Sequence, residues 1–424
     1  MNNSHNGFKR TRHGLIPSSW RNDKLANATS FLKDGTHFSP QSNEGPFRYI
    51  TSKNIRFGKL DLSNCSNIST EDHERIFGAC PVRQGDVLLT KDGANTGNAT
   101  LNTLEEPFSL LSSVAVLRGE SDHLLNEFLL QFILSPRGQY AFTSEMAGQA
   151  ITRLTLTTIG QIEVPLPPLP EQQKIAAILS TWDQAIELTE KLIAAKQKRK
   201  QALIHKLITE PLLAVRHSNP KSGWDEAKLG NLIEKRTQTS SDLESFPLYS
   251  FTIEAGVTPK TDRYERSFLL KDGANNKYAI VRFEDFVVNP MNLRFGAIGR
   301  SRVQNTVSVS AYYDVFSVVN SKCDSSFLEH VLKSPLLFHI YETVATGSLI
   351  EKRRVHFSEF VKISISMPSL DEQTRIASII DLQDNELKML SKKIALIKEQ
   401  KKGLMQQLLI GKVRVNVDSE TVKG

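Results

Sequence analysis

Lysine, arginine and amide side chains gather in a few loop-like segments of this sequence. The segment "SKNIRFGK" begins at Ser52 and "TKDGANTGN" begins at Thr90, each next to short β-type runs. Ammonium and guanidinium groups suit phosphate oxygens, and arginine, lysine, asparagine and glutamine can hydrogen bond to base edges. These loops are therefore candidate contacts to a nucleic-acid duplex. The alternative for each single residue is an ordinary solvated surface.

The candidates fall in both halves of the chain. In the first half they are His37, Lys53, Asn54, Arg56, Lys91, Asn95, Asn98 and Arg153. In the second half they are Lys260, Arg263, Arg266, Asn292, Arg294, Arg300, Arg302, Arg353 and Arg354. For His37, within "DGTHF", the alternative is a turn-stabilising role. Clusters in both halves favour the binding role for the set as a whole.

Composition agrees with a basic, globular chain. The 424 residues carry a net charge of +7, which mildly favours a polyanionic partner. The three cysteines form no CxxC pair, so neither a disulfide framework nor a structural zinc site is expected. No apolar run is long enough to span a membrane, and the N-terminal segment lacks the apolar core of a signal peptide. We expect no membrane partner and a cytoplasmic location.

Motifs for catalysis are missing. The sequence contains neither GxxxxGK[ST] nor GxGxxG, and the histidines lack metal-ligand spacing. The stretch "NPMN" at 289–292 is similar to the base-holding loop of amino-methyltransferases, but it lacks the second proline and the aromatic platform. The triplet "EAK" at 226–228 has metal-nuclease spacing without the upstream Pro-Asp. No catalytic residue and no metal ligand is predicted.

The elements that would position these loops occur twice. Residues 162–210 align without gaps on residues 363–411, with 15 of 49 positions identical. Thus "PLPPLPEQQKIAAIL" from Pro165 returns as "SMPSLDEQTRIASII" from Ser366. The preceding parts repeat more faintly, for example in the W-x3-KL-x-N frame at Trp20 and Trp224. The sequence predicts globular part, long helix, globular part, long helix.

Both repeated segments carry a heptad pattern over about five heptads, typical of a coiled-coil seam. Lys200 and Lys401 interrupt the two seams at the same place, either to set register or partner choice or because a lysine can extend to the rim. Heptads alone leave parallel and antiparallel pairing open. The apolar seam residues are Ile175, Leu179, Trp182, Ile186, Ile193, Leu203, Leu207, Ile376, Ile380, Leu387, Leu390, Ile394, Ile397, Leu404 and Leu408.

Local signals mark the helix starts and the globular parts. Pro170 suits a first helical turn, and Ser369 with Glu372 has capping-box spacing. Residues 15–160 and 223–362 contain short β-type runs separated by turn signals such as "KDG". Helical segments are expected at 123–134 and 326–333. Each globular part is predicted to be a mixed α+β domain with a twisted sheet.

Taken together, these features resemble the specificity subunit of type I restriction–modification enzymes. The resemblance rests on "DGTHFSP" (34–40), "PFRYITSKNI" (46–55), "GDVLLTKDG" (85–93) and the doubled P-x-L-x-E-Q helix start. It covers nearly the whole chain. The second globular part departs from it, because "DGTH" and "GDVL" have no clean counterpart there.

The resemblance implies a domain plan and a function. Target recognition domains would occupy 1–164 and 216–365, and conserved helical regions 165–215 and 366–424, the helices forming an antiparallel coiled coil with a pseudo-twofold repeat. Each domain would read one half of a bipartite asymmetric site in double-stranded DNA, and the helices would fix the spacer. The chain itself would be non-catalytic.

The resemblance assigns the chemistry to partner subunits. Two modification subunits would bind S-adenosylmethionine and methylate adenine N6, and restriction subunits would use ATP and Mg²⁺ to translocate and cleave DNA. Two other classes stay open from the residues alone: an enzyme in its own right, and a coiled-coil scaffold joining two protein-binding domains. Enrichment of a split DNA site would distinguish a DNA-binding specificity subunit from such a scaffold.

Overall fold

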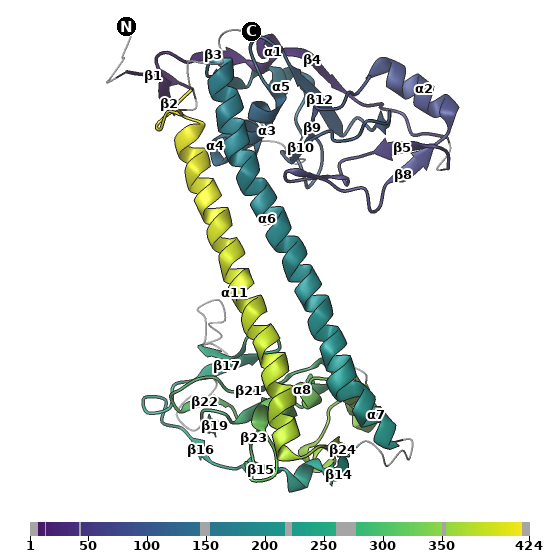
Figure 1. Ribbon diagram of the computed structural model, residues 1–424, viewed down its shortest axis with the longest axis vertical. Helices are drawn as coiled ribbons and strands as arrows, with labels where there is room; N and C mark the ends of the chain where they lie inside the picture. Colours follow the sequence, from purple (N-terminus) through teal and green to yellow (C-terminus); the bar gives the residue numbers. More distant parts are fainter. Residues whose placement is uncertain are drawn as a thin grey trace. The chain divides into compact units, whose positions relative to one another are not determined.

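The fold is described from a computed structural model, shown in Figure 1. It describes residues 7–12, 14–41, 44–144, 153–216, 223–259, 277–349 and 353–417. The chain forms two compact units: unit 1 comprises residues 1–190 and 392–424, and unit 2 comprises residues 191–391. Each unit holds one globular part and a segment of both long helices, α6 (Leu169–Ile204) and α11 (Leu370–Leu408). The units therefore divide both helices, whereas the predicted domain plan gave each helix a region of its own.

Unit 1 is built on a four-stranded antiparallel sheet in the order β10-β9-β12-β4. Strand β9, one of its two central strands, is covered on both faces, because Val87 and Leu89 join one core while Leu88 joins another. A smaller sheet, β11-β5-β8, lies under helix α2 (Thr70–Ala79). The strands of these sheets are β4 (Thr29–Asp34), β9 (Val87–Thr90), β10 (Ala99–Leu101), β12 (Val114–Gly119), β5 (Phe47–Ile50), β8 (Ser66–Ile68) and β11 (Ser109–Leu110).

Shorter elements complete unit 1. The two-stranded pairs are β1 (Phe8–Thr11) with β2 (Gly14–Pro17), β3 (Arg21–Lys24) with β13 (Glu163–Leu166), and β6 (Ile55–Arg56) with β7 (Lys59–Leu60). The short helices are α1 (Leu25–Ala28), α2 (Thr70–Ala79), α3 (Asn126–Leu134), α4 (Pro136–Ser144) and α5 (Leu156–Gln161). The helical segment expected at 123–134 is therefore confirmed as α3.

Unit 2 repeats the main sheet of unit 1 in the order β21-β20-β23-β15. The strands are β15 (Ile233–Arg236), β20 (Phe286–Val288), β21 (Ile298–Arg300) and β23 (Asp314–Val318). Its second sheet joins β16 (Thr239–Ser240), β19 (Tyr278–Val281) and β22 (Val307–Ser310). The same strand order in both units confirms the predicted α+β repeat.

The remaining elements of unit 2 are short. Two-stranded pairs join β14 (Asp225–Lys228) with β24 (Ser364–Met367) and β17 (Tyr249–Thr252) with β18 (Gly256–Pro259). The helices are α7 (Glu210–Arg216), α8 (Ser325–Leu332), α9 (Pro335–Val344) and α10 (Phe357–Phe360), with 3₁₀ turns η3 (Leu229–Asn231) and η6 (Leu293–Phe295). Helix α8 confirms the helix expected at 326–333.

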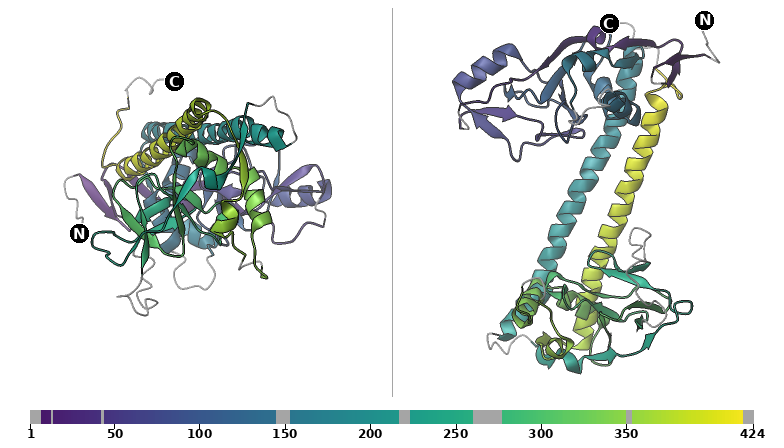
Figure 2. Two further views of the ribbon diagram at one scale, coloured as in Figure 1. Left: turned by 90° about the horizontal axis from the view of Figure 1, so that it is seen from below. Right: turned by 180° about the vertical axis from the view of Figure 1, so that it is seen from behind.

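Within each unit the two helix segments run antiparallel, side by side (Figures 1 and 2). In unit 1, Lys401 Nζ lies 2.5 Å from Asp183 Oδ1. In unit 2, Lys200 pairs with Asp384. These two ion pairs occupy equivalent positions of the repeat, so the shared lysine that interrupts each seam meets the shared aspartate of the opposite helix. The antiparallel pairing implied by the resemblance is confirmed.

The predicted seam residues are all buried or half-buried. Ile175 and Leu179 of α6 share a core with Leu408 of α11 in unit 1. At the end of α6 the chain forms a π-helical turn, His205–Thr209 (η1). Such a turn inserts an extra residue. Ile208, rather than the predicted Leu207, is the fully buried residue there.

The repeated glutamine of each helix start explains the recurring motif. Gln172 is fully buried: its Oε1 accepts the N–H of Leu125 at 2.9 Å, and its Nε2 donates to the carbonyl oxygens of His123 and Pro167. Gln373 repeats the pattern by accepting from the Asp324 N–H and donating to a proline carbonyl. The glutamine thus fastens each long helix to the loop before α3 or α8.

The predicted capping box at the second helix start forms only in part. The Ser369 hydroxyl accepts the Glu372 N–H at 3.4 Å. The Glu372 carboxylate turns instead to the guanidinium of Arg375, one turn along the helix, at 2.6 and 2.7 Å. A charged partner within reach outcompetes the neutral backbone N–H for this carboxylate.

Candidate nucleic-acid interface

A buried lysine organises the candidate loops of unit 1. Lys91 follows strand β9 and is 2% exposed. Its Nζ lies 3.3 Å from Asp34 Oδ2 and 3.1 Å from Asp92 Oδ2. This joins the "DGTH" loop to the "TKDG" loop. In this arrangement Lys91 positions loops and does not offer its ammonium group to a phosphate.

Two predicted contacts lie at the ends of the Lys91 network. The His37 ring nitrogen Nε2 is 3.6 Å from Asp34, and the Arg153 Nε is 3.2 Å from Asp92. Their side chains are 67% and 54% exposed. The backbone reinforces the arrangement, since the Leu154 N–H donates to the Lys91 carbonyl at 2.8 Å. The network therefore presents an imidazole and a guanidinium from one loop cluster.

The hairpin β6–β7 lies against the same end of the sheet. The Gly58 N–H donates to the Ala99 carbonyl at the start of β10, and Asn98 Nδ2 donates to the Ile55 carbonyl at 3.4 Å. Asn54 is buried, with its amide bonded to the Thr51 N–H and the Asp61 carbonyl. Asn54 therefore shapes the hairpin.

The other candidates of this hairpin and of the neighbouring loop keep some access to solvent. Lys53 and Arg56 are exposed, and the Arg56 Nε lies 3.4 Å from Asp61 Oδ2. Asn95 and Asn98 are half-buried in the turn between β9 and β10. The structure thus brings together all the candidates of the first half, of which Lys91 and Asn54 are buried.

The equivalent end of unit 2 carries an arginine cluster. Arg294, on the β20–β21 loop, lies 3.5 Å from Glu342, and Arg353 lies 2.5 Å from the same carboxylate. The Val355 N–H donates to the Pro290 carbonyl, just as Leu154 bonds to Lys91 in unit 1. Arg354 and Asn292 are exposed beside this cluster. Corresponding loops therefore meet at corresponding sheet ends.

Arg300 and Arg302 do not join that cluster. They lie at the opposite end of β21, where Arg300 pairs with Glu284 and Glu329, and Arg302 reaches Glu329 at 2.9 Å. Burial would raise the pKa of Glu329, but Lys333 and the two arginines lower it below its usual value. Arg300 is buried, so this network holds α8 to the sheet. Lys260, Arg263 and Arg266 lie outside the described residues.

An aspartate that recurs in both units was not among the residues predicted from the sequence. Asp86 accepts the Arg83 N–H at 2.7 Å and pairs with Arg118, while Asp285 accepts the Arg282 N–H and pairs with Arg236. The aspartates occupy equivalent places before β9 and β20, but their arginines come from different strands. The shared Asp in "GDV" and "EDF" was the available signal.

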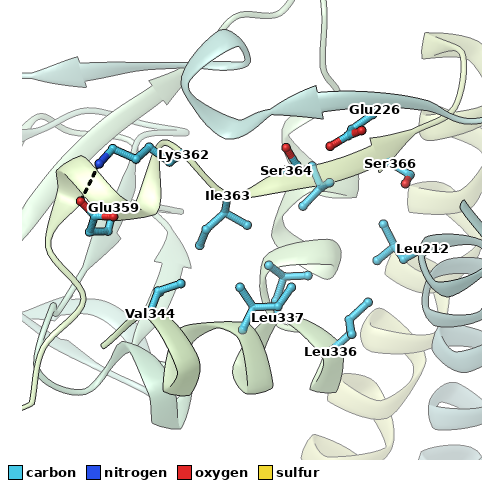
Figure 3. A pocket seen from close by; sticks show the side chains of 12 residues that line it. Leu212, Glu226, Leu336, Leu337, Val344, Glu359, Lys362, Ile363, Ser364 and Ser366 are labelled. Atoms are coloured by element: carbon cyan, nitrogen blue, oxygen red, sulfur yellow. Dashed lines mark hydrogen bonds and ion pairs between the residues drawn. The ribbon is translucent and has the colours of Figure 1, made fainter. Parts of the chain in front are cut away.

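A pocket in unit 2 lies away from these loops. It has a volume of about 450 Å³ between α7, α9, α10 and the β14–β24 pair (Figure 3). Leu336, Leu337 and Val344 line its floor, and the Glu359–Lys362 ion pair of 2.7 Å lies at its rim. The wall combines leucine, isoleucine and valine side chains with two serines, two glutamates and one lysine, so the pocket carries no excess of positive charge like that of the basic loops.

One cluster among the described residues has atoms close enough to hold a cation. Ligand atoms of His330, Asp381 and Asp384 lie within 4.8 Å of one another. Each carboxylate already has protein partners: Asp381 accepts from His330 and Ser326, and Asp384 pairs with Lys200. These contacts fasten α8 and α6 to α11 within unit 2.

Of the helices in the described ranges, none is long and apolar enough to cross a membrane.

Comparison with known proteins agrees with this architecture. The chain is 24% identical over 438 residues to the type I restriction enzyme MjaVIII specificity subunit of Methanocaldococcus jannaschii, covering 95% of each chain. Its fold is similar to the type I S subunit of M. genitalium, with a TM-score of 0.60, 16% identity, and coverage of 96% of this chain and 98% of the other.

A second solved structure has the same fold. It comes from work on complex assembly and conformational transition of the type I R-M system, with a TM-score of 0.54, 17% identity, and coverage of 94% and 99%. The family described as "Type I restriction modification DNA specificity domain" matches residues 29–196 and 221–399. Because these two matches span most of the sequence, the chain belongs to the type I restriction–modification DNA specificity family.

Proposed function

We propose that this chain reads a bipartite, asymmetric site in double-stranded DNA, one half-site for each globular part. The observation that carries this proposal is the repetition of a basic loop cluster at the same sheet end in both units. Unit 1 presents His37, Arg56 and Arg153 there, and unit 2 presents Arg354, with the half-buried Arg353 held beside it by Glu342. Loop sequences differ between the units, so the two half-sites differ in sequence.

The chain acts as the recognition and scaffolding subunit of a larger complex in this proposal. Chemistry belongs to the partners: two modification subunits use S-adenosylmethionine to methylate adenine N6, and restriction subunits use ATP and Mg²⁺ to move along and cut DNA. One of the similar chains comes from a study of type I complex assembly. That relationship supports a multi-subunit assembly for this chain.

An apolar stripe on the outer face of α11 supports the docking of modification subunits. Leu382, Met389 and Leu396 follow at seven-residue spacing, and each is exposed. Leu188 is the equivalent of Met389 on α6 and is exposed as well. Large apolar side chains repeated along one helix face outside the seam are typical of a protein contact.

Leu382→Gln with Met389→Gln should weaken co-purification with modification subunits, whereas Lys388→Gln, on the same helix, should not.

Sequencing of bound DNA tests the recognition role. The chain, co-expressed with its modification subunits, is mixed with random duplexes, and the bound fraction is sequenced. Recovery of two constant half-sites separated by a fixed gap supports the proposal. A bound pool with no enriched motif contradicts it and favours the protein scaffold instead.

A further inference from the structure

Each unit exposes a phenylalanine inside the same tripeptide, Arg-Phe-Gly. Phe57 is 55% exposed in unit 1 and Phe295 is 60% exposed in unit 2. The glycine that follows has a positive φ in both cases, +76° at Gly58 and +93° at Gly296. This backbone conformation makes a tight turn that side chains with a Cβ disfavour. The ring therefore stands at the tip of a tight turn rather than along a strand.

The two phenylalanines come from different segments but reach equivalent places. Phe57 is on the β6–β7 hairpin, and the Gly58 N–H donates to the Ala99 carbonyl at the start of β10 at 2.9 Å. Phe295 is on η6 in the loop that leads into β21, the strand equivalent to β10. Two unrelated loop segments thus deliver an exposed ring to the same end of the repeated sheet. Single exposed apolar side chains are common on protein surfaces, but chance would not place one at the same position in both repeats.

Basic side chains accompany both rings. The Arg294 guanidinium lies 4.6 Å from the centre of the Phe295 ring, and Arg353 joins it through Glu342. Near Phe57, the side chains of Arg56, Lys53 and Lys59 are exposed. A flat apolar ring bordered by positive charge matches a polyanion with apolar, flat groups between its phosphates. Duplex DNA has this chemistry, since bases lie between two phosphate chains.

We propose that Phe57 and Phe295 are base-contacting residues, one for each half-site. Each ring packs against a base, while exposed cations of the same loops hold the flanking phosphates: Lys53, Arg56 and Lys59 in unit 1 and Arg354 in unit 2. This inference rests on the proposed function and assigns it two specificity residues. The two globular parts would then share one kind of apolar base contact, although their loop sequences differ.

The test uses the full chain in complex with its modification subunits. Phe57→Ala and Phe295→Ala are compared with wild type by sequencing of bound sites and by titration of a fluorescent duplex carrying the wild-type site. Each variant should bind that site about tenfold more weakly, as expected for loss of one good base contact. Each should relax base preference in one half-site only, and the two variants should affect opposite half-sites.

Controls separate contact from folding. Phe57→Leu and Phe295→Leu keep an apolar side chain and should retain most of the affinity. Phe283→Ala removes an exposed ring at the opposite end of β20 and should bind like wild type. Because both target rings are exposed, the alanine variants should melt at the wild-type temperature.

Two results would overturn the inference. If wild type enriches a split site and both alanine variants bind it with unchanged affinity and base preference, the recognition role stands and the phenylalanine contacts are wrong. If wild type enriches no split site, the recognition role and the phenylalanine contacts fall together.

Discussion

At the scale of single residues, the charged side chains of the loops divide into those that face solvent and those that hold the loops in place. Lys91 and Asn54 were predicted as contacts because of their type and position, but both are buried and bonded within the protein. His37 and Arg153 keep exposed side chains on the same network. The buried Lys91 thus fixes the position of the exposed Arg153 through their shared partner, Asp92.

Replacing Lys91 with methionine should destabilise unit 1. The change leaves the carboxylates of Asp34 and Asp92 close together without their buried cation, which should cost about 3 kcal/mol of unfolding free energy. Chemical denaturation followed by circular dichroism measures it. Lys53→Met, at an exposed position of the same unit, is the control, and equal stability of the two variants would contradict the structural role of Lys91.

Acid should weaken the contact between α8 and α11. Burial raises the pKa of Asp381, but hydrogen bonds from His330 and Ser326 outweigh this effect and lower it from 3.8 to about 2. The folded state therefore favours the ionised carboxylate. Its stabilising contribution is complete above pH 3.8 and is lost as the pH falls toward about 2.

Asp381→Asn tests this pH dependence. The stability difference between wild type and variant should be largest above pH 4 and should shrink between about pH 4 and pH 2. Denaturant titrations across this range measure it, and Asp371→Asn, an exposed change on the same helix, controls for the altered net charge. A difference that stays constant with pH would show that the contact does not depend on the carboxylate charge.

At the scale of elements, the glutamine of each helix start fastens a long helix to its globular part. Gln172 makes three hydrogen bonds with backbone groups and Gln373 makes two. The sequence marked this motif by repetition, yet a proline-rich strap before an acidic helix start reveals only where a helix begins. Which side chain turns inward depends on the loop that packs above it.

Replacing Gln172 should cost much more stability than replacing the adjacent glutamine, Gln173. Gln172→Leu leaves the Leu125 N–H and the His123 carbonyl without their partner, so it should cost about 3 kcal/mol. The adjacent Gln173 is exposed, and Gln173→Leu should change stability by less than about 0.5 kcal/mol. Thermal melts of the two variants measure the contrast, and similar losses would argue against a buried fastening role.

The lysine shared by both seams contributes to antiparallel pairing through a specific aspartate. Lys401→Asp should destabilise unit 1, and Asp183→Lys in the same chain should restore about 1 kcal/mol of that loss. A double-mutant cycle by chemical denaturation gives the coupling. The Lys200–Asp384 pair is the matched test in unit 2. Coupling of zero in both units would leave the lysines without a role in pairing.

Sequence patterns predicted elements better than they predicted side-chain roles. The heptads gave the helices and the repeat gave the matching sheets, because both depend on the spacing of apolar residues. The lysines, arginines and asparagines of the loops look alike in sequence, although Arg300 is buried against Glu329 and Arg354 is exposed. Partners that fix these differences lie on distant segments, so they became visible only in the fold.

At the scale of the whole molecule, the repeat predicts that the helices set the distance between the two half-sites. Inserting seven residues at equivalent positions, after Glu190 in α6 and after Ser391 in α11, adds about 10 Å of helix and keeps the heptad phase. The spacer of the bound site should grow by roughly 3 base pairs. Sequencing of bound DNA measures the gap, and an unchanged spacer would refute this ruler.

The core of unit 1 includes Met405 and Leu408 from the end of α11, and Leu409, which directly follows that helix. Unit 2, by contrast, is one uninterrupted stretch, residues 191–391. During synthesis on the ribosome, the second globular part can therefore complete its core while the first, made earlier, still waits for the end of the last helix. We therefore expect the order of folding to reverse the order of translation, with the N-terminal part exposing its unfinished core for longer.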